Sequence, residues 1–198
     1  MKDESLRERT LVIFKSDVLP RSLLGTVMSR FESAGFKLIG AKMMKADKNL
    51  LENHYSGDME WVTALGNKTI DNYNAAGMDI KKYMGSDKAE EIGPIVKGQL
   101  LDYMYNKPLV VTVWEGGLGT IAAIRKLIGF TVPTTAEAGS IRSDYSHDSA
   151  ILSSRNNRAI MNLLHASGNK EEAEAEIKLW FGEDFKPLSY ERSDEIFF

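Results

Sequence analysis

The run Thr10-Leu11-Val12-Ile13-Phe14 is the feature that most constrains the fold. Consecutive apolar and β-branched residues favour a strand, and an uninterrupted run of them needs cover on both faces. The chain has 198 residues, 43% of them hydrophobic, which is enough for one sizeable core. We therefore expect a single domain over residues 1–198, built around a sheet in which this run is a central strand.

Apolar residues in other segments recur with the spacing of strands or of helices. Strands are expected at residues 36–44 and 109–114, and in the short apolar run that ends at His165. Pro20 marks the start of the first helix and Gly35 its left-handed end. A βαββαβ sandwich of the α+β class is the simplest closed arrangement for this order of elements. The other helices are expected at residues 45–55, 60–76, 89–106, 117–129 and 170–181.

Charge and composition exclude several classes of protein. With 25 basic and 28 acidic residues, the net charge of −3 argues against nucleic acid or a membrane surface as a partner bound through bulk charge. The absence of cysteine excludes disulfides, thiolate chemistry and cysteine metal sites. No apolar run approaches 18 residues, and Met1 to Arg9 is highly charged, unlike a secretory leader. We expect a soluble, cytoplasmic protein that binds neither nucleic acid nor membrane.

His165 lies between a short apolar run and a turn of small residues, directly before the last predicted helix. Asn169 fits the N-cap of that helix, and Glu172 fits its N3 partner. Glu176 lies on the helix's apolar stripe, where a carboxylate is costly unless a donor reaches it. An imidazole N–H is such a donor, so Glu176 would fix the tautomer of His165 and leave its other nitrogen free as a nucleophile.

Simpler interpretations remain open for these residues. His165 could be a turn residue, and Glu176 could lie at the exposed edge of its stripe. The three histidines, His54, His147 and His165, are far apart and lack the spacing of metal ligands. No G-x-S-x-G elbow, Walker A loop or kinase glycine loop is present, so a nucleotide would have to be held by side chains.

Short segments along the chain resemble, in order, the nucleoside diphosphate kinases. Each segment alone is unspecific, whereas their number and order are highly specific. The resemblance covers residues 5–55, 108–144 and 161–182. The segments are Glu8-Arg9-Thr10, Lys15-Ser16-Asp17, Arg30-Phe31-Glu32, Gly35-Phe36-Lys37-Leu38, His54-Tyr55, Val113-Trp114-Glu115-Gly116, Ser140-Ile141-Arg142, Asn162-Leu163-Leu164-His165-Ala166-Ser167 and Ile177-Lys178-Leu179-Trp180-Phe181.

The resemblance implies a ferredoxin-like βαββαβ fold with a four-stranded antiparallel sheet, assembled into hexamers or tetramers. It also implies ping-pong transfer of the γ-phosphate of ATP, or of another nucleoside triphosphate, to a nucleoside diphosphate through a phosphohistidine. Magnesium would be carried on the nucleotide, with no metal site on the protein.

The resemblance also implies roles for individual residues. His165 would be the nucleophile, with Glu176 accepting its second N–H and Ser167 beside that pair. Lys15 and Tyr55 would contact the transferred phosphate, with Lys15 also near the ribose. The remaining nucleotide contacts would be Arg125, Thr131 and Arg142 to the phosphates and Asn162 to the sugar.

The chain departs from the family pattern in two motifs and two lengths. Lys15-Ser16-Asp17 stands for K-P-D, and His165-Ala166-Ser167-Gly168 stands for H-G-S-D. Two regions are longer: an inserted helical region at about 56–106, interpreted as packing or subunit contact, and a lengthened loop at about 145–160. Trp61 is a candidate for stacking on the base. The departures motivate an alternative, a nucleotide-binding or scaffold protein with little or no turnover.

Overall fold

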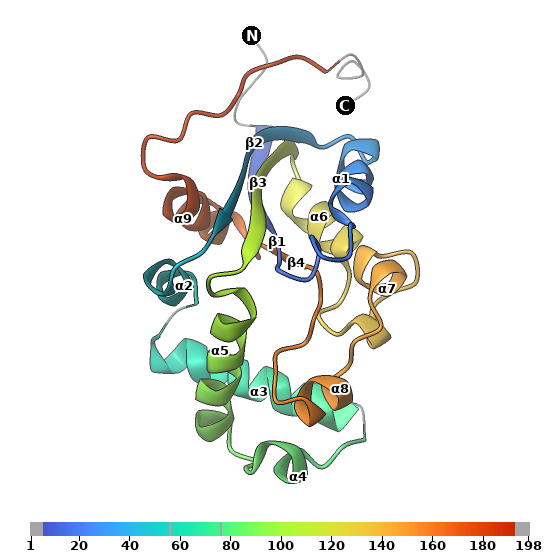
Figure 1. The fold of residues 1–198 in the computed structure, drawn as a ribbon. Helices are drawn as coiled ribbons and strands as arrows, with labels where there is room; N and C mark the ends of the chain where they lie inside the picture. The colour runs from blue at the N-terminus through green and yellow to red at the C-terminus, as the bar shows by residue number, and fades with distance from the viewer. Residues whose placement is uncertain (1–5, 56, 76, 193–198) are drawn as a thin grey trace.

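The protein folds around a four-stranded sheet in a computed structural model that describes residues 6–55, 57–75 and 77–192. The strand order is β2-β3-β1-β4, and every neighbouring pair is antiparallel (Figure 1). The predicted four-stranded antiparallel sheet with helices packed on it is therefore confirmed. The strands are β1 (Arg7–Phe14), β2 (Lys37–Lys45), β3 (Pro108–Gly117) and β4 (Leu164–Ala166).

Helices cover both faces of the sheet (Figure 1). Helices α1 and α6 lie over one face, and α9 and α2 lie over the other. No helix in the described part of the chain is long and apolar enough to cross a membrane. The helices are α1 (Leu24–Ser33), α2 (Lys48–His54), α3 (Met59–Ala75), α4 (Ile80–Met84), α5 (Ala89–Met104), α6 (Thr120–Ile128), the 3-10 helix η2 (Pro133–Thr135), α7 (Ile141–Tyr145), α8 (Ala150–Arg155) and α9 (Lys170–Phe181).

Strand β1 separates two hydrophobic clusters, as its apolar run predicted. Val12 and Phe14 point into the cluster under α1 and α6, whereas Leu11 and Ile13 point into the cluster under α9 and α2. All four side chains are fully buried. Burial of each one stabilises the fold by about 1.5–3 kcal/mol, so β1 anchors both halves of the core.

Helix α2 starts at Lys48 rather than near residue 45, because β2 continues to Lys45 and Asp47 caps the helix. Two further helices also begin later than the sequence predicted. Helix α1 starts at Leu24 rather than near Pro20, because Ser22 takes a left-handed φ of 54° that interrupts helical geometry. Helix α6 starts at Thr120 rather than near residue 117, because β3 continues to Gly117 and Gly119 turns the chain with a φ of 88°. Both shifts lie at turns, where the apolar pattern carries little information.

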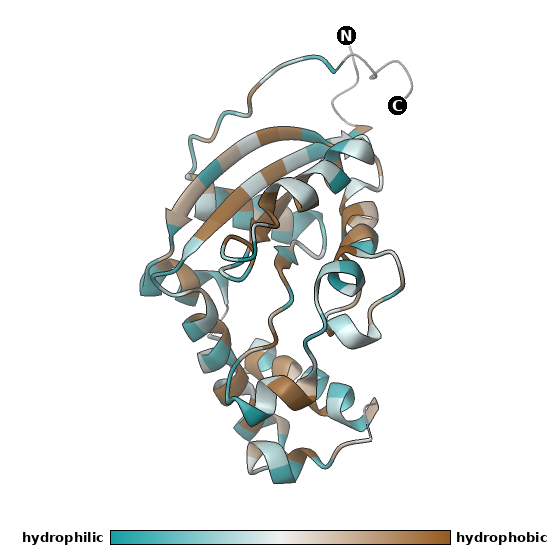
Figure 2. Ribbon diagram, turned by 45° about the vertical axis from the view of Figure 1, so that its right-hand side comes forward, coloured by the Kyte–Doolittle hydropathy of each residue, from teal (hydrophilic) through white to brown (hydrophobic). Residues whose placement is uncertain are grey.

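A third hydrophobic cluster lies away from the sheet, among α3, α4, α5 and α8. It joins Tyr73, Ile80 and Ile92 to Ala150, and Figure 2 shows that this lower group of helices has hydrophobic stretches of its own. The lengthened loop expected at about 145–160 is corrected in one respect: it contains a helix, α8. Ser149 caps α8 by accepting a hydrogen bond from the backbone N–H of Leu152 at 3.3 Å, and Ala150 packs into the cluster.

Candidate active site

The short strand β4 sets the direction of His165. It pairs with the end of β1, with Ile13 opposite His165. Its neighbours Leu164 and Ala166 point into the core under α6, so alternation along the strand turns His165 toward α9. Just before the strand, Leu163 adopts a left-handed φ of 68°, a conformation that costs a non-glycine residue about 1–3 kcal/mol. The backbone is thus bent sharply directly ahead of the candidate nucleophile.

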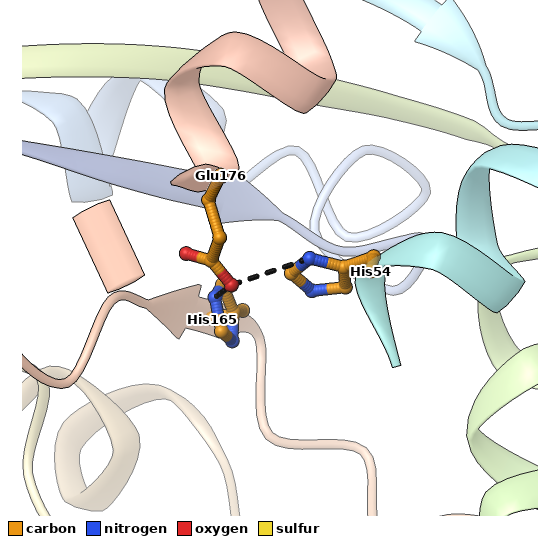
Figure 3. Close-up of side chains that lie close together, drawn as sticks. All are labelled: His54, His165 and Glu176. Carbon is orange, nitrogen blue, oxygen red and sulfur yellow. Dashed lines mark hydrogen bonds and ion pairs between the residues drawn. The ribbon is translucent and has the colours of Figure 1, made fainter. Parts of the chain in front are cut away.

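Glu176 on α9 receives the His165 side chain, as its position on the apolar stripe predicted. His165 Nε2 lies 2.7 Å from Glu176 Oε1 (Figure 3). Ser167 Oγ donates to Glu176 Oε2 at 2.6 Å. Ser167 is fully buried and Glu176 is 7% exposed. Burial raises the pKa of Glu176, against the opposing effect of nearby His54 and of the Ser167 hydrogen bond. Both carboxylate oxygens are therefore engaged, and the imidazole has a fixed orientation.

His54 forms a third member of this cluster, which sequence reasoning had not assigned a role. Its Nδ1 lies 3.2 Å from Glu176 Oε1 (Figure 3). The same nitrogen accepts a hydrogen bond from Trp180 Nε1 at 3.2 Å. Its ring meets that of His165 edge-on, with centroids 4.6 Å apart. Burial lowers the pKa of His54, so its ring is neutral at pH 7. His54 therefore restricts the rotation of the His165 ring without adding charge.

Lys15 lies at the end of β1 and points into the same site. Its Nζ donates to Asn162 Oδ1 at 2.9 Å, and Asn162 Nδ2 donates to the carbonyl of Thr131 at 2.9 Å. Lys15 is only 5% exposed, and burial, together with the charge of Arg142, lowers its pKa from 10.5 to about 7. Burial makes the charged form of Lys15 costly, and an anion bound beside it would favour that form.

Arg125 and Arg142 lie across the cavity from α3. Arg125 donates from Nη1 to the carbonyl of Ala166 at 3.2 Å. Arg142 donates to three backbone carbonyls, those of Asn162, Gly129 and Leu164, at 3.0, 2.9 and 2.6 Å. Burial and the charge of Arg125 lower the pKa of Arg142 to about 10, so it remains charged at pH 7. Neither guanidinium forms a salt bridge with a carboxylate of the described residues.

Tyr55 lines the edge of the site and is largely buried. Its ring is 7% exposed, and its hydroxyl donates to Met104 Sδ at 3.2 Å. Burial raises the pKa of this hydroxyl. Trp61 lies beside it, with ring centroids 6.1 Å apart. A contact between Tyr55 and a phosphate would require the hydroxyl to leave Met104.

One cavity of about 530 Å³ connects these groups. Eight of the nine predicted site residues line it, together with Trp61, whereas Ser167 lies outside it and donates a hydrogen bond to Glu176. Helices α3, α5 and α8 form its outer wall, so the inserted helical region at about 56–106 also borders the site. The predicted residues that line it are Lys15, Tyr55, Arg125, Thr131, Arg142, Asn162, His165 and Glu176.

The altered turn after His165 is accommodated by Glu172. The Glu172 carboxylate accepts a hydrogen bond from the backbone N–H of Gly168 at 2.7 Å, while its own N–H is capped by Asn169 Oδ1 at 2.8 Å. A methyl group at Gly168 would come within 2.5 Å of Glu172 Oε2. Glu172 thus places a carboxylate beside the turn, where the family motif has an acid at the position of Gly168.

Comparison with known proteins gives a consistent result. A family model described as nucleoside diphosphate kinase matches residues 8–62 and 89–185. A nucleoside diphosphate kinase from Pyrobaculum aerophilum is 41% identical over 177 residues, covering 89% of this chain and 96% of the relative. The crystal structure of an NDP kinase from that organism has a TM-score of 0.82 at 40% identity, covering 90% of this chain and 97% of that one.

A second similar structure was solved with bound ligands. It is the transition state mimic of nucleoside-diphosphate kinase from Borrelia burgdorferi with bound vanadate and ADP, with a TM-score of 0.76, 34% identity and 96% of both chains covered. The matched residues include the four strands of the sheet, from Glu8 onward, and the helix that carries Glu176. The chain therefore belongs to the nucleoside diphosphate kinase family, enzymes that transfer the terminal phosphate of a nucleoside triphosphate to a nucleoside diphosphate.

Proposed function

We propose that this transfer passes through a phosphohistidine at Nδ1 of His165. The contact between His165 Nε2 and Glu176 Oε1 carries the proposal, because an acceptor at Nε2 keeps the proton there and leaves the lone pair on Nδ1. Nδ1 has no hydrogen-bond partner among the described residues. Burial and the charge of Lys15 lower the pKa of His165, so the neutral, nucleophilic ring dominates at pH 7.

The reaction then takes two balanced steps. The Nδ1 lone pair attacks the γ-phosphorus of the triphosphate, the bond to the bridging oxygen breaks, and the nucleoside diphosphate leaves with that electron pair. The ring becomes positively charged, and the carboxylate of Glu176 stabilises it through Nε2–H. A terminal phosphate oxygen of a second diphosphate attacks the same phosphorus, and the N–P electron pair returns to Nδ1. The order is ping-pong.

The other predicted residues bind and orient the nucleotide in this proposal. Lys15 neutralises the transferred phosphate and lies near the ribose, and Tyr55 contacts the same phosphate. Trp61 is the candidate for stacking on the base. Side chains rather than a glycine loop hold the rest of the nucleotide, with Arg125, Thr131 and Arg142 at the phosphates and Asn162 at the sugar.

Nucleoside diphosphate kinases work with a divalent metal, and we propose Mg²⁺ bound to the phosphates of the nucleotide. Among the described residues, the one cluster able to hold an ion is His54, His165 and Glu176. Two imidazoles and a single carboxylate suit Mg²⁺ poorly, because it prefers oxygen ligands and retains water. Bound to the nucleotide, the ion lowers the phosphate charge that the cavity must neutralise.

The phosphohistidine is tested by incubation of the protein with ATP labelled at the γ-phosphate. We expect acid-labile, base-stable label on the protein and its release on addition of any of several nucleoside diphosphates. The variant His165→Ala should lose both label and exchange, and retention of either contradicts the assignment. ADP binding by the parent protein without transfer would favour the alternative, a binding or scaffold protein that lacks turnover.

We also propose a cytoplasmic homo-oligomer, a hexamer or a tetramer, with all 198 residues in one domain. The family resemblance supports the assembly, and the packing of α3, α5 and α8 around the same cavity as the sheet supports one domain. Light scattering coupled to gel filtration measures the mass of the assembly, and a mass of about 22 kDa would contradict it.

A further inference from the structure

Helix α3 presents one face to the cavity. The residues of that face recur at helical spacing, and a single charged residue, Lys68, lies among them. The family model leaves residues 63–88 unmatched, so Lys68 lies in a segment outside the part shared with the family. The face consists of Trp61, Leu65, Lys68, Thr69, Asn72 and Tyr73.

Close contact with α5 holds α3 in this position. A methyl group at Gly66 would lie 2.1 Å from the carbonyl oxygen of Ala89, and a methyl group at Gly93 would lie 2.1 Å from that of Val62. The two helices therefore meet backbone against backbone, which only glycine permits. Lys68 follows Gly66 by two residues, so the same contact fixes where its side chain starts.

Lys68 faces an excess of positive charge. Lys15, Arg125 and Arg142 line the same cavity, and among the described residues no carboxylate forms a salt bridge with any of these four cations. Enclosure in the cavity, followed by the charges of Arg125 and Arg142, lowers the pKa of Lys68, and Glu172 is the one charge that opposes this shift. Such an arrangement is unfavourable when empty and favourable around a ligand with several negative charges.

We propose that Lys68 binds the phosphate chain of the nucleotide from the inserted helix, opposite Arg125 and Arg142. The inference rests on the proposed nucleotide site and adds a binding residue to it. Lys68 lies on α3, whereas His165 lies on β4. Lys68 therefore contacts the phosphate chain equally in the bound complex before transfer and during the transfer step. Its loss should then weaken nucleotide affinity more than the rate of the bound complex.

The test compares Lys68→Met, Lys68→Arg and a control, Lys82→Met, on the exposed surface of α4 outside the cavity. Titration calorimetry should show ADP binding about tenfold weaker in Lys68→Met, restored by Lys68→Arg and unchanged in Lys82→Met. Adenosine, which has no phosphate, should bind all variants equally. At saturating ATP, the rate of labelling of the protein should stay within about threefold of the parent.

An ADP affinity of Lys68→Met within twofold of the parent would overturn the inference. So would an equal loss of adenosine affinity, because that would indicate a distorted cavity rather than a lost phosphate contact. Thermal denaturation of each variant checks that α3 remains folded. Failure of the proposed function has a different signature, the absence of label on the parent protein while the ADP affinities of the variants still differ.

Discussion

The cavity has two walls of different construction. The wall made by β1, β4 and α9 holds its polar groups with short hydrogen bonds, such as those that join Glu176 to His165 and Ser167 at 2.7 and 2.6 Å. The wall made by α3, α5 and α8 contributes one unpaired charge, Lys68, on a helix held by glycine contacts. Reacting atoms require fixed geometry, whereas a long flexible side chain such as that of Lys68 can adjust the position of its charge.

The largest effect is expected from a substitution in the first wall, made by β1, β4 and α9, and it should appear in the rate of phosphoryl transfer. Glu176→Gln keeps the size of the side chain but removes the charge that stabilises the phosphorylated ring, so the rate of phosphoryl transfer should fall about 100-fold or more. ADP affinity should change little, because both carboxylate oxygens of Glu176 are engaged by His165 and Ser167. Rapid-quench measurement of labelling by ATP gives the rate. Glu174→Gln, on the exposed side of α9, is the control, and equal rates in the two variants would contradict the role of Glu176.

A substitution that separates α3 from α5 in the second wall should lower both the stability of the protein and its affinity for ADP. Gly93→Ala places a methyl group 2.1 Å from the Val62 carbonyl oxygen, which should lower the free energy of unfolding by about 1–3 kcal/mol. Displacement of α3 should also raise the KM for ADP. Gly98→Ala on the same helix meets nothing within 4 Å and should instead stabilise by about 0.5–1 kcal/mol. Chemical denaturation measures both, and equal shifts would show that the two helices can separate freely.

The smallest effect is a proton taken up at Lys15. With a pKa of about 7, Lys15 is mostly neutral at pH 8 in the empty site. A bound phosphate favours the charged form and raises this pKa, so ADP binding at pH 8 should take up as much as about one proton, and affinity should fall as pH rises from 7 to 9. Calorimetry in two buffers of different ionisation enthalpy counts the proton. Lys15→Met should show no uptake, and uptake equal to the parent's would assign the proton elsewhere.

The spacing of hydrophobic residues predicted those parts of the site that are formed by one strand or helix and the element next to it in the sequence. The apolar run at residues 10–14, the range 170–181 of the last helix and the contact of Glu176 with His165 all follow from which face of an element is buried. Buried side chains recur every two residues along a strand and every 3.6 residues along a helix, so the sequence shows directly which face of each element is buried.

Features that depend on the meeting of distant elements were not predictable in this way. The face of α3 has a helical period, but nothing in its sequence shows that it lies opposite Arg125 and Arg142. The same holds for His54, which reaches Glu176 from α2, and for Glu172, whose carboxylate fills the space beside Gly168. Helix α8 is short, and its capping Ser149 is one of several serines in a polar segment, so its signal was weak.

The brevity of β4 has a consequence for the kinetics of folding. Its three residues pair with the end of β1, and the hydrogen bond from Lys15 to Asn162 spans 147 positions of the chain. Contacts between such distant segments form slowly, because closing the intervening loop costs entropy before the contact repays it. His165 and Lys15 therefore meet only after β4 has docked. During refolding, we expect transfer activity to return later than helical content, and its recovery to report the arrival of this strand.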